Sequence, residues 1–146
     1  MGLGSGALVL LPENVIPPPH GMWSGCLGVT SALVETMSQE VTLPAGLKTL
    51  TLSGSICIAT DETDNLEHDL LSLDMLNGET VIARLGTLSN RDGANSCSFK
   101  PLVVNPAQLI GDPAEATLRL RATQDGPNLR TTFYFDDLKL TVGCTP

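Results

Sequence analysis

Short runs of alternating apolar and polar residues recur along the chain, with Gly, Pro, Asn and Asp between them. Successive side chains of a strand point to opposite faces of a sheet, so this alternation predicts strands that are buried on one face. In residues 48–60 the apolar face holds Leu50, Leu52, Ile56 and Ile58. In residues 116–123 it holds Leu118, Leu120 and Ala122. No segment keeps a long helical period, and the pattern therefore predicts an all-β protein.

Turn signals separate the predicted strands. These strands are residues 22–28, 38–44, 48–60, 70–76, 80–86, 97–105, 116–123 and 131–142. Asn77-Gly78 is the strongest short hairpin signal in the chain, and Pro101 indicates an edge strand or a bulge. Roughly seven to nine short strands at this spacing are typical of an antiparallel β-sandwich. We assign one such domain to residues 21–146 and expect residues 1–20 to be an irregular, Pro-rich segment that adds one strand at most.

Two adjacent carboxylates, at positions 136–137, interrupt the last predicted strand. The alternation places Asp136 on the same face as Leu138, toward the expected core, with Phe133 and Phe135 on the opposite face. An unpaired buried carboxylate is costly, so we expect Asp136 to accept backbone hydrogen bonds or to pair with an arginine. We expect the two phenylalanines to pack in the interior and not to form an exposed patch.

Composition and charge exclude several partners. Hydrophobic residues make up 42% of the 146 residues and aromatic residues only 3%, so a single core must be mainly aliphatic. The formal net charge of -8 repels nucleic-acid phosphates and anionic lipid headgroups. The longest apolar run, residues 6–12, is far shorter than the ~20 residues that span a bilayer. We therefore expect no nucleic-acid partner and no membrane insertion.

The four cysteines, Cys26, Cys57, Cys97 and Cys144, are widely spaced. Without a C-x-x-C pair and with only two histidines, a zinc site is disfavoured. An even number of distant cysteines in an acidic, Lys-poor chain favours two disulfides and an oxidising compartment over buried thiols. Four cysteines allow three pairings; we expect Cys26 with Cys144 and Cys57 with Cys97. The N-terminus lacks the basic region of a signal peptide, so we expect a removed leader or an export signal elsewhere.

A characteristic order of motifs extends over about residues 21–142. The motifs are "MWSGCLG", "ETMSQEVTLPAGLKTLTLSGSICI", an acidic loop, "HDLLSLDML" and the closing "AEATLRLRATQDGPNLRTTFYFDDLKLT". This order resembles a bacterial extracellular jelly-roll domain akin to carbohydrate-binding modules, and the closing motif is the most specific part. The resemblance implies a secreted or cell-surface jelly-roll β-sandwich that serves as a non-catalytic accessory module and binds a glycan.

The resemblance also implies a structural calcium ion. In related jelly rolls the first Asp of the closing pair ligates calcium and ties the last strand to the N-terminal segment, and that position here is Asp136. Calcium takes six to eight oxygen ligands. We therefore take Glu13 and Asp137 as further candidate ligands, and hydrogen bonding of Asp136 without a metal stays open.

Trp23, Arg119 and Arg121 are the candidate ligand-binding residues. Trp23 offers an aromatic platform for a sugar ring, or belongs to the core or its rim. Where related domains carry an aromatic in "TLSFWL", this chain has "TLSGSI" at residues 51–56. Arg119 and Arg121 project to one face and suit a carboxylate or an acidic sugar. The alternative is solvation or cross-strand pairing with an acid such as Asp74.

No sequence motif predicts an enzyme. His20 lies among prolines and His68 in the acidic loop at residues 60–69, without a G-x-S-x-G, an H-E-x-x-H or a Gly-rich phosphate loop. The acidic loop also lacks the spacing of an EF-hand calcium loop, so we expect it to be solvated.

Two function classes follow from these observations. The first is an accessory binding module whose partner is a glycan or a cell-surface protein. The second is a structural or adhesive subunit of a cell-surface layer or filament, which forms homo-oligomers. In that second class the N-terminal segment pairs with the sheet edge of a neighbouring subunit.

Overall fold

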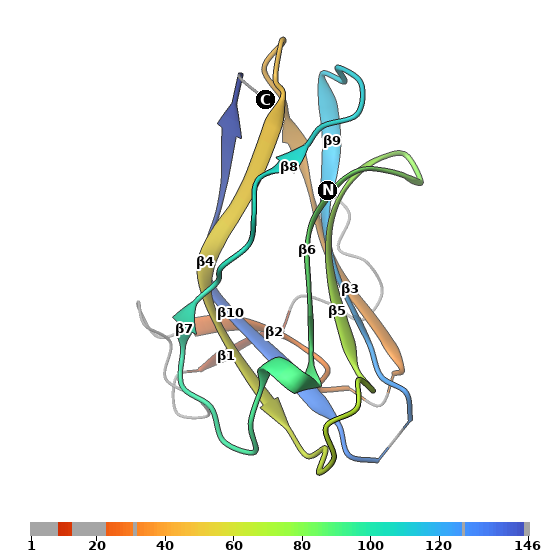
Figure 1. Cartoon of the computed structure of the whole chain (residues 1–146), viewed down its shortest axis with the longest axis vertical. Helices are drawn as coiled ribbons and strands as arrows, with labels where there is room; N and C mark the ends of the chain where they lie inside the picture. The colour runs from red at the N-terminus through yellow and green to blue at the C-terminus, as the bar shows by residue number, and fades with distance from the viewer. Residues whose placement is uncertain (1–8, 13–22, 31, 127, 145–146) are drawn as a thin grey trace.

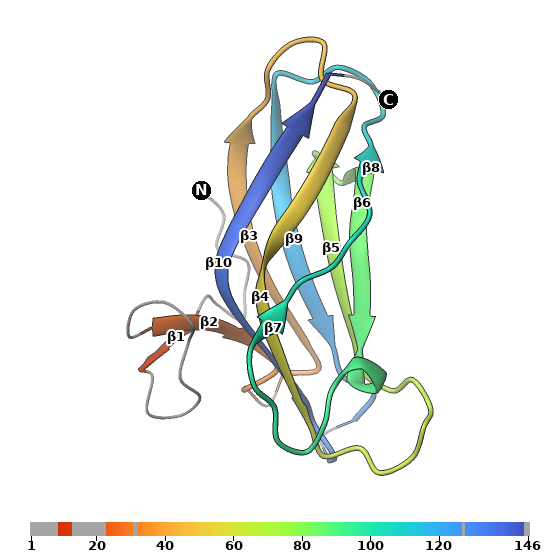
Figure 2. The same ribbon diagram turned by 60° about the vertical axis from the view of Figure 1, so that its left-hand side comes forward.

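The computed structural model describes residues 9–12, 23–30, 32–126 and 128–144, with the backbone alone for residues 9–12 and 23–24. Two antiparallel sheets face each other across one main apolar core, as the edge-on view in Figure 2 shows. The described ranges contain one short 3₁₀ helix, η1 (Asn90–Asp92), and otherwise strands and loops. The predicted antiparallel jelly-roll β-sandwich is confirmed.

The first sheet has six strands and is built around two long ones (Figure 1). β4 (Thr49–Thr60) and β10 (Thr131–Gly143) pair along almost their whole length. The shorter strands are β1 (Val9–Pro12), β2 (Trp23–Leu27), β7 (Lys100–Pro101) and β8 (Ala107–Gln108). β7 pairs with β4 alone, so Pro101 lies in an edge strand as predicted.

The second sheet has the order β3-β9-β5-β6. Its strands are β3 (Val34–Thr42), β9 (Glu115–Thr123), β5 (Leu70–Asn77) and β6 (Thr80–Ser89). β5 and β6 form the predicted hairpin, but Asn77 pairs with Thr80, so the turn residues are Gly78 and Glu79. Gly78 has a φ of 62° and takes the first central position, where a type II′ turn requires glycine.

The core consists of the faces that the alternation selects. Leu50, Leu52, Ile56 and Ile58 of β4 are at most 2% exposed. They share one cluster with apolar side chains of β5, β6 and β9 from the other sheet. Phe133 and Phe135 belong to the same cluster, which confirms that they pack in the interior. Each such side chain stabilises the fold by about 1.5–3 kcal/mol when fully buried, so a mainly aliphatic core is sufficient.

A β-bulge explains the two adjacent carboxylates in β10. Asp136 pairs with Ser55 and Lys139 with Ser53, so β10 carries one extra residue between these pairs. The extra residue shifts the alternation, and Phe135 before the bulge and Leu138 after it both contact the core. Asp136 is half-buried and shares the opposite face with Tyr134. The expectation that Asp136 faces the core is therefore wrong, because it assumed an uninterrupted period of two.

The residue types at the bulge match its backbone. Asp137 has a φ of 54°, in the left-handed region that Asp and Asn tolerate better than most other side chains. Its N–H donates a hydrogen bond of 2.8 Å to Oδ1 of Asp136. Gly54 of β4 lies opposite with a φ of 152°. Its missing side chain leaves room for the carbonyl groups of both aspartates.

One of the two expected disulfides is present. Cys57 and Cys97 are bonded, with their Cα atoms 5.6 Å apart. Cys57 lies on the outer face of the six-stranded sheet, in a small buried cluster with Cys26 and Tyr134. The bond holds the segment that follows η1 against this face, where Phe99 packs on the cluster.

The prediction of a disulfide between Cys26 and Cys144 is wrong. Cys26 is buried opposite Tyr134, near the start of β10, whereas Cys144 is exposed beyond the end of that strand. At 3.3 Å per residue the two sites are about 30 Å apart, and a disulfide needs Cα atoms within about 7 Å. Burial, together with the negative charge of Glu35, raises the pKa of Cys26 to about 11, so it remains a protonated thiol.

Replacing Gly54 with alanine tests the bulge. A Cβ atom at this position lies 2.9 Å from Cδ2 of Leu138 and 3.0 Å from the carbonyl oxygens of Asp136 and Asp137. We expect Gly54→Ala to lower the free energy of unfolding in urea by about 1–3 kcal/mol. Gly126→Ala is the control, because its Cβ meets nothing within 4 Å, and we expect a change below about 0.5 kcal/mol. Equal effects of the two substitutions contradict this account.

Removing the disulfide tests its contribution to stability. The bond closes a loop between residues 40 positions apart. Loop-closure entropy predicts that Cys57→Ala/Cys97→Ala loses about 4 kcal/mol of unfolding free energy. Chemical denaturation with and without reductant measures this, since the double variant alone should be insensitive to reductant. A wild-type midpoint that reduction leaves unchanged would falsify the prediction.

Candidate functional site

The outer face of the four-stranded sheet carries rows of polar side chains in register. One row runs across all four strands as Ser38, Arg119, Asp74 and Arg84. The next row is Thr36, Arg121, Ser72 and Thr87. Because the alternation directs the apolar residues of these strands inward, the hydroxyl, guanidinium and carboxylate groups gather on the outside. We call this surface the polar sheet face.

Asp74 is the electrostatic centre of the polar sheet face. It is 1% exposed although it lies on an outer surface, because two arginine side chains flank it from the neighbouring strands. Oδ1 of Asp74 lies 2.9 Å from Nε of Arg84, and Oδ2 lies 3.5 Å from a terminal nitrogen of Arg119. The two guanidinium groups compensate the desolvation of the carboxylate. Arg119 thus makes the cross-strand ion pair with Asp74 that the sequence left open as the alternative to ligand binding.

Arg121 differs from Arg119 in its surroundings. It lies on the same face of β9, two residues further along, but opposite Ser72 in place of an acid. Its side chain is exposed and makes no ion pair with any residue in the described ranges. Arg121 is therefore the guanidinium of the polar sheet face that an external anion can approach.

A shallow groove adjoins the polar sheet face near the β5–β6 hairpin. Its volume is about 340 Å³, at the small end of the ~300–1,000 Å³ range of ligand pockets. Its lining consists of Glu40, Val41, Thr42, Leu76, Gly78, Glu115, Ala116 and Thr117. Carboxylates and hydroxyls thus surround an apolar floor that includes Leu76, which is 5% exposed.

Aromatic side chains contribute little to this surface. Phe133 and Phe135 are in the core, Tyr134 is 8% exposed, and Phe99 packs against the Tyr134 cluster. The backbone of Trp23 lies in β2, and its side chain is outside the described residues. Among the described side chains, none therefore forms an aromatic platform for a sugar ring.

The calcium site implied by the sequence resemblance stays a prediction. Oδ1 of Asp136 accepts the N–H of Asp137, whose own side chain is exposed at the bulge. Glu13, the expected N-terminal ligand, lies outside the described residues, as does His20. Within the described ranges, the group of metal-ligating side chains that the fold brings together is a different one, Glu62, His68 and Asp125.

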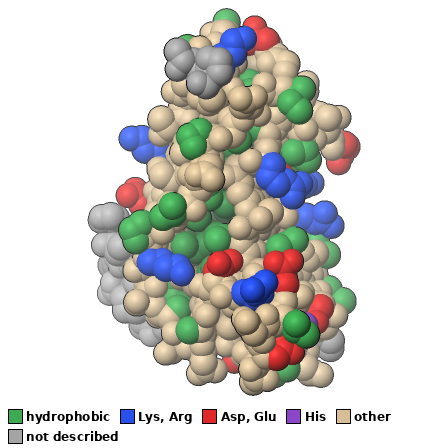
Figure 3. All heavy atoms as spheres, in the orientation of Figure 1, with side chains coloured by type: hydrophobic (Ala, Val, Ile, Leu, Met, Phe, Trp, Pro, Cys, Tyr) green, Lys and Arg blue, Asp and Glu red, His purple; other side chains and the backbone are tan. Residues whose placement is uncertain are grey.

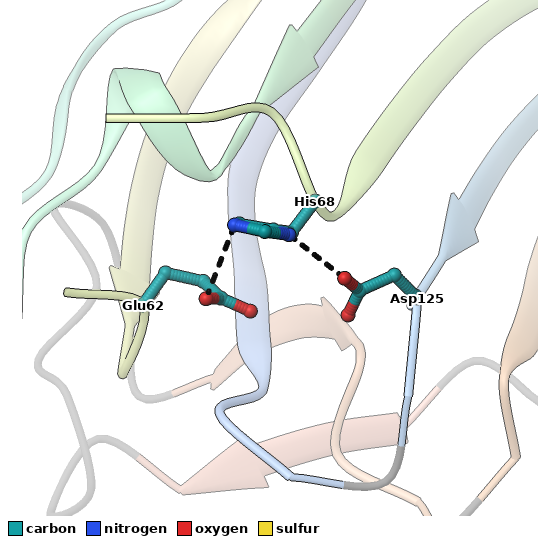
Figure 4. A group of neighbouring side chains, drawn as sticks. All are labelled: Glu62, His68 and Asp125. Atoms are coloured by element: carbon teal, nitrogen blue, oxygen red, sulfur yellow. Dashed lines mark hydrogen bonds and ion pairs between the residues drawn. The ribbon is translucent and has the colours of Figure 1, made fainter. Parts of the chain in front are cut away.

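His68 stands at the centre of a cluster between two loops at one end of the sandwich (Figure 4). Nδ1 of His68 lies 2.8 Å from a carboxylate oxygen of Asp125 in the β9–β10 loop. Nε2 lies 2.9 Å from Asp64 and 3.7 Å from Glu62, both in the β4–β5 loop. Hydrogen bonds with Asp64 and Asp125 raise the pKa of His68, while burial raises that of Glu62.

Buried polar groups hold the backbone of this cluster in place. Oδ1 of Asn90 accepts the N–H of His68 at 2.8 Å. Oδ1 of Asp69 accepts the N–H of Asp125 at 3.0 Å. The hydroxyl oxygen of Thr60 accepts the N–H of Glu62 at 3.1 Å. Asn90, Asp69 and Thr60 are each at most 6% exposed. Glu62, His68 and Asp125 are therefore each positioned by a separate interior side chain.

The sequence alone does not predict this cluster. His68 lies in an acidic loop that its sequence predicts to be solvated, and Asp125 is 57 residues away in the chain. Only the antiparallel pairing of β5 with β9 and of β4 with β10 brings the two loops to the same end of the sandwich. No local motif signals such a contact.

Solved structures of other proteins share the fold of this chain. No family model matches the sequence, and no curated protein matches it. The solved structure of TmCBM61 in complex with β-1,4-galactotriose is similar, with a TM-score of 0.53 and 12% sequence identity over 94% of this chain and 83% of that chain. The chain has a β-sandwich fold like that of this carbohydrate-binding module.

A second solved structure shares the fold. It is a cyclase from Fischerella sp. TAU in complex with 4-(1H-indol-3-yl)butan-2-one, with a TM-score of 0.51 and 17% identity. The match covers 86% of this chain and 66% of the cyclase chain. At these identities the likeness shows the fold alone, because unrelated functions are built on the same β-sandwich.

The stability contribution of His68 should depend on pH. Its pKa is raised above the ordinary 6.5 by its carboxylate partners, so its contribution is fully present below about pH 6.5 and is lost as pH rises through the folded-state pKa. We expect His68→Gln to lower Tm most at pH 6 and to approach the wild type by pH 9. Glu67→Gln, an exposed change in the same loop, should show no such trend. A His68→Gln deficit that grows with pH contradicts the proposed ion pairs.

Proposed function

We propose that this domain is a non-catalytic binding module that takes a glycan on its polar sheet face. The observation that carries the proposal is an accessible sheet surface with in-register rows of guanidinium, hydroxyl and carboxylate groups on a carbohydrate-binding-module fold. Sugar hydroxyls need such paired donors and acceptors at fixed spacing. A sheet supplies that spacing, because neighbouring strands lie about 4.8 Å apart.

The charges in the two central rows of the polar sheet face favour an acidic glycan. These rows hold three arginines, Arg84, Arg119 and Arg121, and one carboxylate, Asp74, which pairs with Arg84 and Arg119. This local excess of positive charge contrasts with the net charge of -8 of the whole chain. A guanidinium binds a carboxylate through two parallel hydrogen bonds, so Arg121 suits the carboxylate of a uronic acid.

The adjoining groove extends the proposed site. Thr117 lies on the same face of β9 as Arg119 and Arg121, and it lines the groove together with Glu115. If the carboxylate of a glycan binds Arg121, the neighbouring sugar units can therefore extend along β9 toward the groove. There Glu115 and Thr117 offer acceptors for sugar hydroxyls, and Leu76 offers an apolar contact to a ring face.

Catalysis is not part of this proposal. The fold is shared with a cyclase, so fold alone does not decide between binding and catalysis. The proposed site is an open surface, whereas catalytic groups act most strongly where water is excluded. A binding module therefore accounts for the arrangement better than an enzyme.

An extracellular location belongs to the same proposal. A structural disulfide such as that between Cys57 and Cys97 persists in an oxidising compartment and is rare in a reducing one. Among the described residues, no helix has the length and apolar character that crossing a membrane requires. We propose that the domain acts outside the cell or on its surface.

One observation favours the alternative, an assembly subunit. β2 covers β10 only at residues 133–135, so from Lys139 to Gly143 the described strand partner of β10 is β4 alone. The other side of this strand segment can accept a strand from a second chain. A homo-oligomer or a cell-surface protein partner would use this edge and leave the polar sheet face unaffected.

A glycan array, followed by titration of the best binder, tests the proposal. We expect saturable binding of uronic-acid glycans by a monomer, and Arg121→Gln should weaken it at least tenfold, about 1.4 kcal/mol. Arg91→Gln is the matched control, because Arg91 is an exposed arginine on η1, away from the polar sheet face. Equal losses in both variants, or a sugar-blind protein that elutes as an oligomer, rule out the proposed site.

A further inference from the structure

The cluster of Glu62, His68 and Asp125 has the donor set of a metal site. One carboxylate oxygen of Glu62, one of Asp125 and one ring nitrogen of His68 all lie within 4.8 Å of one another. Asp64 adds a further oxygen 2.9 Å from Nε2 of His68. Ligand atoms around a tetrahedral zinc ion, at bonds of about 2.1 Å, are roughly 3.4 Å apart. Asp125 faces Nδ1 of His68 and Glu62 faces Nε2, so closing the site requires a contraction of about one ångström between the two loops together with a rotation of the imidazole.

The surroundings of the Glu62 carboxylate also favour a bound cation. The side chain of Glu62 is 5% exposed, and among the described residues the nearest charged partner of its carboxylate is Nε2 of His68 at 3.7 Å, beyond hydrogen-bond length. Within the described ranges no donor hydrogen-bonds to this carboxylate, and Figure 4 shows that it points at the imidazole. A carboxylate that is largely shielded from water and accepts no hydrogen bond is costly, and a cation bound by it and the imidazole lowers that cost.

The surroundings of the cluster match those of known metal sites. Asn90, Asp69 and Thr60 fix the backbone of the three ligand residues through separate hydrogen bonds. Such outer contacts orient the ligands before a metal arrives. The local charge is also unbalanced, because none of the described lysines and arginines forms an ion pair with Glu62, Asp64 or Asp125. On the face in Figure 3, acidic side chains gather in the lower half of the molecule.

We propose that Glu62, His68 and Asp125 bind a divalent transition-metal ion that joins the β4–β5 loop to the β9–β10 loop. An imidazole nitrogen combined with carboxylates suits zinc and similar ions, whereas calcium takes oxygen ligands. The ion replaces one of the two ring protons that the carboxylates favour on the imidazole. This site is separate from the polar sheet face and from the expected calcium site at Asp136.

Calorimetric titration with Zn²⁺ tests the proposal. The protein carries Cys144→Ser, because Cys144 is exposed and a cysteine thiolate is itself a good zinc ligand. We expect one Zn²⁺ per chain, and at least tenfold weaker binding in Glu62→Gln, His68→Gln and Asp125→Asn. Glu62→Gln is the most informative variant, since its carboxylate accepts no hydrogen bond from the described residues and its loss leaves the metal-free fold intact. Glu67→Gln removes the same charge from an exposed position and should stay within twofold.

Two further readouts separate a specific site from a diffuse acidic surface. Co²⁺ should give visible absorption bands of nitrogen and oxygen ligation, and His68→Gln should remove them. Zn²⁺ affinity should fall as the pH is lowered from 8 to 6, because protons compete for the imidazole, and an equal concentration of Ca²⁺ should not displace Zn²⁺. Absence of saturable 1:1 binding, equal weakening by Glu67→Gln, or displacement by Ca²⁺ overturns the proposal.

Discussion

The pairing of β4 with β10 is the interaction on which the rest of the structure depends. These two strands form the centre of the six-stranded sheet and present Leu50, Ile56 and Phe133 to the core. Every other strand of that sheet is short: β2, β7 and β8 pair with one of these two, and β1 joins the sheet through β2. The pairing needs a bulge at Asp137, and the bulge needs a residue without a side chain at Gly54. The glycine and the two aspartates are therefore one structural device, which keeps Leu138 in contact with the core after Phe135.

Buried polar groups organise the end of the sandwich where the loops meet. Thr131 begins β10 and is 0% exposed. Its hydroxyl donates to Asp69 at 2.6 Å, and its N–H donates to Gln124 at 3.0 Å. Because such groups are costly to leave unsatisfied in the interior, they tie the β4–β5 and β9–β10 loops to the same few atoms. The positions of His68 and Asp125 on the surface follow from this interior network.

The polar sheet face shows how one β-strand serves two purposes. The inward side chains of β9, such as Leu120, belong to the core, and the outward ones, such as Arg121, are available to a ligand. Asp74 makes the arrangement stable, because without its carboxylate two neighbouring guanidinium groups would repel each other. The fold thus presents an open polar surface, and the cluster around His68 lies apart from it.

The sequence by itself determined the fold class, the core faces of β4 and β9, the β5–β6 hairpin, the edge position of Pro101 and the bond between Cys57 and Cys97. These features depend on local alternation, on turn residues and, for the disulfide, on cysteines within neighbouring β-like runs, all of which are visible along the chain. Only the tertiary structure decided the orientation of Asp136, the separation of Cys26 from Cys144, and the meeting of His68 with Asp125. A bulge changes the phase of a strand without changing its residue pattern, and strand pairing brings together loops that no local interaction relates.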